Sequence, residues 1–508
     1  MKTSRRRLDV DVEELDRVID AAENGPLSKA DRQKLKTTLH ALVERLAQKR
    51  NTEKTNSVLE PKNSSPSATE SPEPEPTAPA GHGRNAASAF TGAEKVCVQH
   101  AQLKPGDPCP ECCEGRVYRQ KEPKTLIRIV GQAPVKATVF EMERLRCNAC
   151  CEVFTASQPQ SAGPEKFDPT AVAMIALLKY GTGMPFNRME RLEGQLGMPL
   201  PAATQWELMA AAAKQIKRIL GEFIRQAAQG SVMHNDDTSM RVLKLVRNTD
   251  DERTGVFTSG IVSICGGWKI ALYFTGWKHA GENLADVLKQ RAAELKAPIQ
   301  MCDAVSRNSP KLIETLLANC LAHGRRQFTE VADSFPDECR YVLESLGAVY
   351  GFDAEAKDLG LTPEERLTFH QTHSAPVMED LRQWMAAQFA EHKTEPNSGL
   401  GKASSYLLRH WTKLTLFLRQ QGAPLDNNVV ERALKKAILH RKNALFYKTM
   451  NGARVGDLFM SLIHTCELNK VNPFDYVTEL LRHPAEVAVR PAEWMPWNYR
   501  RDATVAAA

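Results

Sequence analysis

The pattern of apolar residues changes at Ser231, and this change constrains the fold of the 508-residue chain more than any other feature. Three strand-like runs follow one another: SVMHNDDTSMRVLKLV from residue 231, GVFTSGIVSICGG from 255 and WKIALYFTGW from 268. Four further segments are predicted as a helix (AGENLADVLKQRAAEL), a strand (APIQMCDAV), a helix (SPKLIETLLA) and a strand (NCLAHGRRQF). Three meandering strands followed by alternating elements predict an α/β core built on one sheet.

The predicted order, β-β-β-α-β-α-β, is that of an RNase H-like domain, and it brings acidic residues from separate segments together. Asp236 and Asp237 lie in the first strand, and Asp303 lies at the carboxyl end of the fourth, where open α/β sheets usually form their sites. Because successive strand residues face opposite sides of a sheet, we select Asp236 rather than Asp237. Glu431, on a later helix, completes a set of three carboxylates. Such hard ligands hold Mg²⁺ or Mn²⁺, and a pair of these ions acts on phosphodiesters.

Glu431 lies in the segment PLDNNVVERALKKAILHRKN, residues 424–443, which predicts a helix with one apolar face packed inward. Asn427, Glu431 and Lys435 recur at four-residue intervals and share another face. Taken alone, the segment favours a capped surface helix with an exposed Glu431–Lys435 ion pair. As part of a metal site, Glu431 is the third ligand and its neighbours face DNA. The residues expected to contact DNA are Asn427, Arg432, Lys435, Arg325 and Arg326, and for the last two a solvated strand end is an equal alternative.

Seven of the twelve cysteines lie between residues 97 and 151, and their spacing predicts a zinc site. Two CxxC pairs, Cys109 with Cys112 and Cys147 with Cys150, enclose a β-rich stretch, which is the spacing of a zinc ribbon. Thiolates two residues apart can turn back onto one tetrahedral ion, and two such pairs complete its coordination, so the zinc would be structural. Cys97 and His100 form a CxxH pair that binds a second ion or replaces one CxxC pair.

The termini and the composition indicate the compartment. The N-terminal segment, MKTSRRRLDVDVEELDRV, lacks the apolar stretch of a signal peptide, and the longest apolar runs are too short to span a bilayer. Twelve cysteines in a chain without an export signal indicate a reducing compartment, so we expect a cytoplasmic protein that is nucleoid-associated when bound to DNA. Four leucines in residues 35–46 predict a short coiled coil or a helical hairpin. Residues 51–90, rich in Ser, Pro and Glu, predict a disordered linker.

Several segments resemble the transposases of the bacterial insertion sequence 66 family. These are HNDDTSMRVL, WKHAGENLADVL, MCDAVSRN, LANCLAHGRRQF and the long segment that begins LDNNVVERALKKAILHRKN, and the resemblance covers roughly residues 95–480. It implies a DDE transposase in which a helical insertion interrupts the RNase H-like core, with Asp236, Asp303 and Glu431 as catalytic residues. Many relatives have Asp-Glu where this chain has Asp236 and Asp237, and an Asp-Gly-Tyr type segment where it has CDAVSRN.

The expected fold class is a multidomain α+β protein with an RNase H-like α/β catalytic core and a helical insertion, preceded by N-terminal helices and a zinc-ribbon-like module. The expected order is helical or coiled-coil residues 1–50, a linker at 51–92, a zinc-binding ribbon-like module at 93–158, a helix-turn-helix-like segment at 165–229, the first part of the core at 230–328, the helical insertion at 329–422, the Glu431-bearing helix of the core at 423–450, and C-terminal helices and tail at 451–508.

The expected activity is metal-dependent cleavage of DNA at the ends of an insertion sequence, which frees a 3′-hydroxyl that then attacks target DNA. Expected partners are DNA, further copies of the chain in a dimer or larger assembly, and small accessory proteins encoded by the same element, with no membrane involved. One rival is a hydrolytic nuclease with the same metal site. The other is a non-catalytic zinc-ribbon DNA-binding protein, a domesticated remnant. Joining of labelled 3′ ends to a second DNA separates the first rival from a transposase, and DNA binding without metal-dependent cleavage favours the second.

Overall fold

The computed structural model describes residues 97, 101–110, 114–120, 126, 133–146, 148, 153–245, 253, 255–311 and 313–499. The chain divides into two compact units, one formed by Met1–Lys62 with Val139–Ala508 and the other by Asn63–Thr138. The segments expected to form N-terminal helices (1–50) and a linker (51–92) lie outside the described residues.

In the smaller unit, the residues on either side of 111–113 pair with each other in antiparallel fashion. The amide of Cys109 donates to the carbonyl of Gly115 over 2.8 Å. Pro108 and Arg116 form an antiparallel bridge one step further from the turn. The chain therefore reverses direction just after Cys109, at the place where the sequence carries the first CxxC pair.

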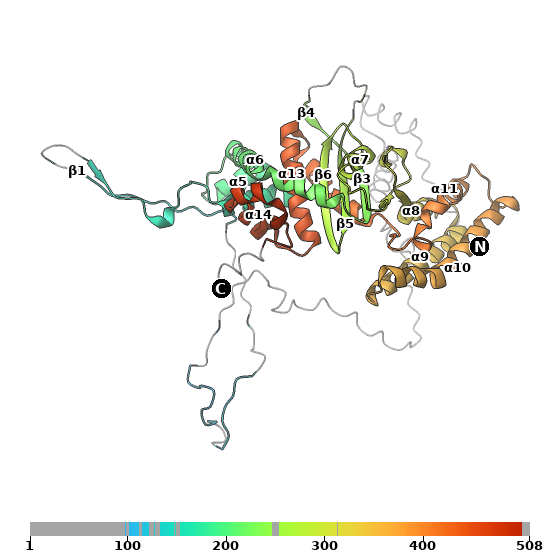
Figure 1. Ribbon diagram of the computed structural model, residues 1–508, viewed down its shortest axis with the longest axis horizontal. Helices are drawn as coiled ribbons and strands as arrows, with labels where there is room; N and C mark the ends of the chain where they lie inside the picture. Colours follow the sequence, from blue (N-terminus) through green and yellow to red (C-terminus); the bar gives the residue numbers. More distant parts are fainter. Residues whose placement is uncertain are drawn as a thin grey trace, which may run out of the picture. The chain divides into compact units, whose positions relative to one another are not determined.

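The larger unit is organised around a five-stranded mixed sheet with the strand order β6-β5-β3-β7-β8 (Figure 1). The strands are β3 (Val232–Met240), β5 (Val256–Cys265), β6 (Trp268–Gly276), β7 (Ile299–Cys302) and β8 (Leu316–Asn319). β3, β5 and β6 are antiparallel neighbours, whereas β7 runs parallel to β3 and β8 runs parallel to β7. Most residues of the central strands are buried, because helices cover both faces of the sheet.

The helices on the two faces are distinguished by their contacts with neighbouring residues of β5. A Cβ added at Gly260 would contact a leucine of α12 (Asn428–Ala444), so α12 covers one face. The hydroxyl of Ser259 accepts a hydrogen bond from an asparagine of α7 (Ala280–Leu288), so α7 covers the other. α6 (Ala202–Ala227) packs on the α7 face, since its last carbonyl accepts a hydrogen bond from a serine of β5 on that side.

The outer edge of the sheet is covered by α13 (Met450–Leu468), which hydrogen-bonds directly to the backbone of β6. The acceptors recur at four-residue intervals along the helix and just beyond it, at Asp457, Ser461, Thr465 and Asn469. The donors are the backbone amides of Thr275, Tyr273, Ala271 and Lys269, at 2.7, 3.1, 3.0 and 3.0 Å respectively. Four helical residues rise about 6 Å and two strand residues about 6.6 Å, so the two repeats stay in step. α13 thus satisfies the amides that an edge strand leaves unpaired.

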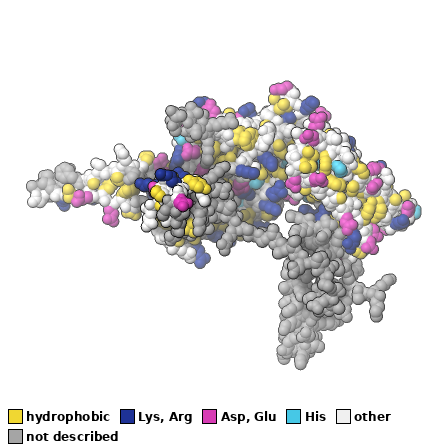
Figure 2. All heavy atoms as spheres, turned by 90° about the horizontal axis from the view of Figure 1, so that it is seen from below, with side chains coloured by type: hydrophobic (Ala, Val, Ile, Leu, Met, Phe, Trp, Pro, Cys, Tyr) yellow, Lys and Arg dark blue, Asp and Glu magenta, His cyan; other side chains and the backbone are white. Residues whose placement is uncertain are grey.

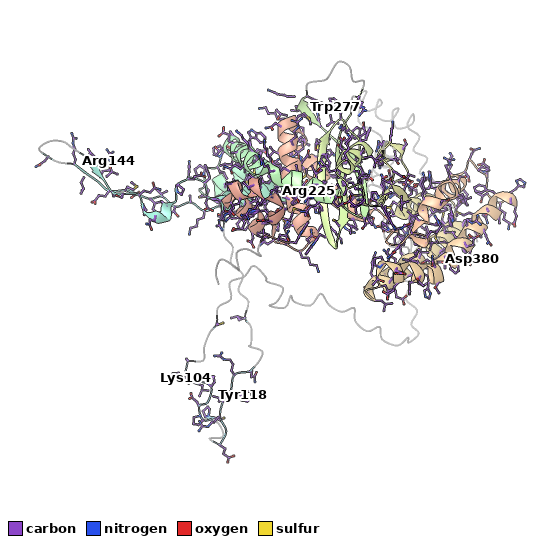
Figure 3. All side chains as sticks on the ribbon, in the orientation of Figure 1. Lys104, Tyr118, Arg144, Arg225, Trp277 and Asp380 are labelled. Atoms are coloured by element: carbon purple, nitrogen blue, oxygen red, sulfur yellow. The ribbon has the colours of Figure 1, made fainter. Side chains whose placement is uncertain are left out.

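Between β8 and α12 the chain forms a helical insertion (Figure 1). Its helices are α8 (Leu321–Val331), α9 (Pro336–Asp358), α10 (Pro363–Ala390) and α11 (Gly399–Leu414), followed by the 3-10 turn η5 (Leu416–Leu418). Phe328, Leu346, Leu381 and Leu407 form one apolar core with Met301 of β7, so the insertion and the sheet share buried surface. In Figure 3, the labelled Asp380 marks α10 of this insertion.

The other elements flank the sheet in sequence. Before it come β1 (Arg144–Arg146), β2 (Val153–Thr155), η2 (Gln160–Ala162), α4 (Pro169–Ala176), the π-helical turn η3 (Leu177–Gly181) and α5 (Phe186–Gln195). Two short strands, β4 (Val242–Lys244) and β9 (Tyr447–Thr449), pair in parallel. After α13 come α14 (Pro473–Arg482), α15 (Pro484–Val489) and η6 (Pro491–Trp494). Across the described part of the chain, every helix is either too short or too polar to cross a bilayer.

The sheet differs from the prediction at two consecutive segments. Residues 309–318, predicted as a helix, include most of β8, and residues 319–328, predicted as a strand, form most of α8. Tertiary pairing decides both cases, because β8 buries its last residues beside β7 and α8 buries Phe328 in the core of the insertion. Among the described residues of the link from β7 to β8, the regular structure is therefore the 3-10 turn η4 (Ser306–Asn308).

Candidate active site

Asp236 and Asp237, adjacent residues of β3, face opposite sides of the sheet. The buried carboxylate of Asp237 lies 2.9 Å from Nδ1 of His279, which precedes α7, and 3.3 Å from a guanidinium nitrogen of Arg307. The cross-strand partner of Asp236 is Gly260, which faces α12. Opposed residues of neighbouring strands share a face, so Asp236 lies on the α12 side.

The side-chain amide of Asn308 joins two of the carboxylates selected from the sequence. Its Nδ2 donates to Asp303 Oδ1 and lies 3.4 Å from Asp236 Oδ1. Asn308 is fully buried, and its backbone carbonyl accepts hydrogen bonds from the side chains of Asn235 and Gln300 at 2.8 and 2.6 Å. The carboxylates of β3 and of the residue that follows β7 are therefore held together at the carboxyl end of β7, which runs parallel to β3.

The environment of Asp236 disfavours a bare negative charge. Burial, together with the neighbouring charges of Asp303 and Asp237, raises the pKa of this carboxyl to about 6 against the opposing hydrogen bonds from the Asp237 amide and from Asn308. Like charges at this spacing are stabilised by a cation between them. The pair Asp236 and Asp303 therefore fits a hard divalent ion such as Mg²⁺ or Mn²⁺.

Glu431 lies in the first turn of α12 and points toward α8. Its Oε1 is buried and has no hydrogen-bond partner among the described residues. Nδ1 of His323 lies 3.8 Å from this oxygen, and it is likewise buried and without a hydrogen-bond partner among the described residues. A buried carboxylate oxygen without a donor is costly, so this oxygen is suited to a cation or to a rotation of the side chain.

Cys320 completes a cluster with His323 and Glu431, in which one ligand atom of each lies within 4.8 Å of the others. Burial raises the pKa of the Cys320 thiol to about 12, so without a bound cation the sulfur is protonated. In this state the sulfur accepts the amide of Asn427 at 3.2 Å, which fixes the start of α12 beside α8.

Asn427, expected from its spacing to contact DNA, is completely buried at the start of α12. Its Nδ2 donates to the carbonyl of Asn235 at 3.1 Å, and its Oδ1 lies 3.1 Å from Nδ1 of His234. Burial lowers the pKa of His234 to about 4, so this ring is a neutral partner. The assignment of Asn427 to DNA contact is therefore wrong for this structure, and the residue instead ties α12, and with it Glu431, to β3.

The basic residues expected to contact DNA divide by exposure. Arg432 and Lys435 of α12 and Arg326 of α8 are exposed. Arg325 is buried on α8, and burial lowers the pKa of its guanidinium, so its assignment to DNA contact is also corrected. The sequence placed both arginines at the end of a strand, whereas a helix turns Arg325 inward and leaves Arg326 in solvent. Figure 2 shows Lys and Arg side chains in several groups over the middle of the face that it presents.

The predicted zinc ligands are only partly within the described residues. Cys97 is exposed and Cys109 is half-buried. The other predicted ligands, Cys112, Cys147, Cys150 and His100, lie outside the described residues.

Two residues of the site were not selected from the sequence. Asn308 lies in CDAVSRN, five residues after Asp303, where the departure from an Asp-Gly-Tyr type segment was the available signal. His323 lies in NCLAHGRRQF, three residues after Cys320, in the segment from which only Arg325 and Arg326 were predicted to have a function. Neither residue belongs to a periodic pattern, so only the fold brings them to the carboxylates.

Comparisons with known proteins identify a family for the chain. Residues 165–455, more than half of the chain, match the family model described as "Transposase IS66 family". Three proteins of Sinorhizobium fredii, each described as uncharacterized, are similar over much of the chain. They are y4hP, 25% identical over 419 residues (78% of this chain and 74% of the relative), y4jD, 24% identical over 425 residues (79% and 80%), and y4qI, 23% identical over 353 residues (65% and 62%).

Proposed function

We propose, since the chain belongs to the IS66 family of transposases, that it cleaves DNA at the ends of an insertion sequence and joins the freed 3′ ends to target DNA. The observation that carries the proposal is the shared amide of Asn308, which holds Asp236 and Asp303 together. Two carboxylates from separate strands, held beside the first turn of a helix that carries Glu431, form a site of the kind that phosphoryl transfer requires.

The strand order supports an RNase H-like core for this site. In chain order, three antiparallel strands form one half of the sheet and two parallel strands extend it beyond β3, the first of the three. Asp236 lies on β3 at the centre, Asp303 follows the neighbouring β7, and α12 crosses the same face. The helical insertion separates Asp303 from Glu431 in sequence, while α12 returns the chain to the face of the sheet that carries Asp236.

Asp236, Asp303 and Glu431 would hold the divalent ions. Mg²⁺ or Mn²⁺ bound there supplies activation of the attacking oxygen and stabilisation of the leaving one at a phosphodiester. Asn308 fixes the separation of Asp236 and Asp303 before any ion binds. Asn427 fixes the start of α12 against β3, and in this proposal the Glu431 side chain turns from His323 toward the other carboxylates when the ions bind.

The exposed cations Arg432, Lys435 and Arg326 would contact DNA phosphates. Such contacts position the duplex without reading its sequence, and they make affinity fall with salt concentration. The reversal of the chain after Cys109 supports a knuckle that binds structural zinc with the second CxxC pair. Two element ends must be held together, so a dimer or larger assembly on DNA belongs to the proposal.

The test uses the purified full-length protein and DNA that carries the genomic segments flanking its gene. Mg²⁺ or Mn²⁺ is added, and nicked and joined products are scored for the parent, for Glu431→Gln and for Glu330→Gln. Glu330 is an exposed carboxylate of α8 and serves as the matched control. Affinity for the same DNA is measured in parallel, so that a loss of binding is not taken for a loss of chemistry.

Joined products with the parent and with Glu330→Gln, but not with Glu431→Gln at equal DNA affinity, would support both the strand transfer and the third ligand. Nicks without joining would favour the hydrolytic nuclease. Metal-independent DNA binding without any cleavage would favour a non-catalytic protein. Equal activity of the parent and Glu431→Gln would refute the assignment of Glu431.

A further inference from the structure

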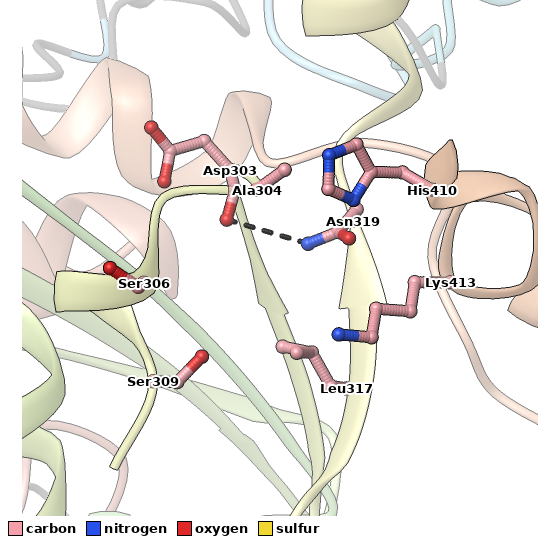
Figure 4. Close-up of a pocket in the computed structure, with 8 residues that line it drawn as sticks. All are labelled: Asp303, Ala304, Ser306, Ser309, Leu317, Asn319, His410 and Lys413. Atoms are coloured by element: carbon pink, nitrogen blue, oxygen red, sulfur yellow. Dashed lines mark hydrogen bonds between the residues drawn. The ribbon is translucent and has the colours of Figure 1, made fainter. Parts of the chain in front are cut away.

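A pocket of about 220 Å³ opens beside Asp303 (Figure 4). Its walls come from two places: the loop and strands at the end of the sheet, and α11 of the helical insertion. The lining residues include Asp303, Ser306, Leu317, Asn319, His410 and Lys413. The pocket therefore has one of the proposed metal ligands in its wall, and whatever enters it lies next to the reacting phosphodiester.

Asn319, the last residue of β8, gives the pocket a buried acceptor. It is 1% exposed, and its Nδ2 donates to the backbone carbonyl of Asp303 at 3.4 Å (Figure 4). Its Oδ1 has no hydrogen-bond partner among the described residues. A buried acceptor without a donor costs free energy, so the side chain is prepared for a ligand that carries an N–H group. A phosphodiester has no such donor and cannot by itself satisfy Oδ1.

The opposite wall supplies a cation and a ring. Lys413 is exposed on α11 and makes no hydrogen bond or ion pair within the described residues. His410 lies one turn earlier, and its ring contacts that of Tyr406 at a centroid distance of 4.9 Å. Burial, together with the nearby charges of Lys413 and Arg409, lowers the pKa of His410, so the ring presents a neutral surface at neutral pH. Leu317 adds an apolar surface on the strand side.

We propose that this pocket binds one unpaired base of the DNA strand next to the reacting phosphodiester, with Asn319 Oδ1 accepting an N–H group of the base and Lys413 contacting the adjoining phosphate. The inference rests on the proposed function. The volume exceeds that of a single water, about 30 Å³ in the liquid, and falls below the about 300 Å³ at which pockets for drug-sized ligands begin. Enzymes that act on DNA bind extruded bases by hydrogen bonds to the base edge and by stacking.

The test measures the affinity of the full-length protein for labelled duplexes by fluorescence anisotropy, in buffer without Mg²⁺ or Mn²⁺ so that no cleavage occurs. The duplexes are fully paired, or carry one bulged nucleotide that is adenine, unsubstituted purine or abasic. Purine lacks the exocyclic amine of adenine and is otherwise the same ring. The variants are Asn319→Leu, Lys413→Ala and, as a matched control, Lys402→Ala, which is exposed on α11 and does not line the pocket.

We expect the parent and Lys402→Ala to bind the adenine bulge about tenfold or more tightly than the abasic bulge, and more tightly than the purine bulge. Asn319→Leu should bind adenine and purine bulges equally. Lys413→Ala, at an exposed position where folding is not at risk, should weaken binding of bulged duplexes more than of the paired duplex.

Equal binding of all four duplexes by the parent would overturn the proposal, as would a preference for adenine over purine that persists in Asn319→Leu. Because the assay needs no cleavage, its outcome is separate from that of the strand-transfer test. Base-dependent binding without any cleavage would support the base pocket and refute the proposed transposase activity. Strand transfer without base-dependent binding would support the transposase activity and refute the base pocket.

Discussion

Replacing Asp457 by asparagine should remove a pH-dependent loss of stability. Asp457 is buried on α13, where its Oδ2 accepts the amide of Thr275 and its Oδ1 accepts the hydroxyl of the same residue, both at 2.7 Å. The hydroxyl of Thr258 lies 2.8 Å from that of Thr275. In Asp457→Asn, the new amide can donate to the Thr275 hydroxyl, which then donates to Thr258, so every hydrogen bond has a counterpart.

The magnitude follows from the pKa of Asp457, which burial raises from 3.8 to about 7 against the opposing hydrogen bonds from Thr275. A raised pKa means that the folded protein keeps a proton that the unfolded chain loses near pH 4. The free energy of unfolding therefore falls as pH rises from about 4 to about 7, and it changes no further above that. At about 1.4 kcal/mol per pH unit, the loss amounts to roughly 4 kcal/mol. Asparagine does not ionise, so the variant does not undergo this loss of unfolding free energy.

The assay is denaturant-induced unfolding of the parent and of Asp457→Asn, under reducing conditions, between pH 4 and pH 8. We expect similar stability at pH 4 and a variant that is more stable by a few kcal/mol at pH 8. Asp380→Asn, at an exposed position of α10, should follow the parent at every pH. A difference between parent and Asp457→Asn that stays constant across this range would refute the reasoning.

Two further pairs of variants test the packing of α12. Asn427→Ala should lower the free energy of unfolding by about 2–5 kcal/mol in denaturant titrations, because it leaves the Asn235 carbonyl and the His234 ring, both buried on β3, without these partners. Lys435→Ala should leave stability unchanged. It should instead reduce the slope of the logarithm of DNA affinity against the logarithm of salt concentration by about one. The opposite pattern would return Asn427 to the DNA interface. Gly260→Ala should cost about 1–3 kcal/mol in the same titrations, because its Cβ would lie 2.9 Å from a side-chain carbon of Leu434, while Gly221→Ala, in open space on α6, should stabilise by up to about 1 kcal/mol. Equal effects of the two alanines would argue against close packing of α12.

The sequence predicted β5, β6 and β7 within a few residues and the first residues of β3 and α7, since each is a run of apolar residues long enough to display its period. The first predicted strand divides into β3 and β4, and α7 ends at Leu288, whereas the prediction extended to Leu295. It did not predict β8, because Leu, Glu and Ala in residues 309–318 favour a helix locally. Only the parallel neighbour β7 makes an extended conformation favourable there. Residues 319–328 were predicted as a strand but mostly form a helix, because their burial depends on the insertion helices that follow.

The site was predictable to the extent that its residues belong to regular elements. Alternation along β3 indicated that only one of Asp236 and Asp237 faces the predicted site, and the helical period placed Glu431 beside Lys435. The same period suggested that Asn427 shares their exposure, yet it is buried while Glu431 is half-buried and Lys435 is exposed. The start of α12 lies against the sheet, so residues on one helix face differ in exposure. The helical period of the sequence does not reveal the angle between a helix and a sheet.

The four-residue polar repeat of α13 also restricts how copies of this chain can meet. An edge strand with free amides is a template on which a second copy or an extended peptide can add a strand. Along β6 that template is occupied, because Asp457, Ser461, Thr465 and the asparagine beyond them already take the outward amides. Strand exchange across this edge would require α13 to detach. Any multimer formed on DNA without detachment of α13 must therefore be joined through surfaces other than this one.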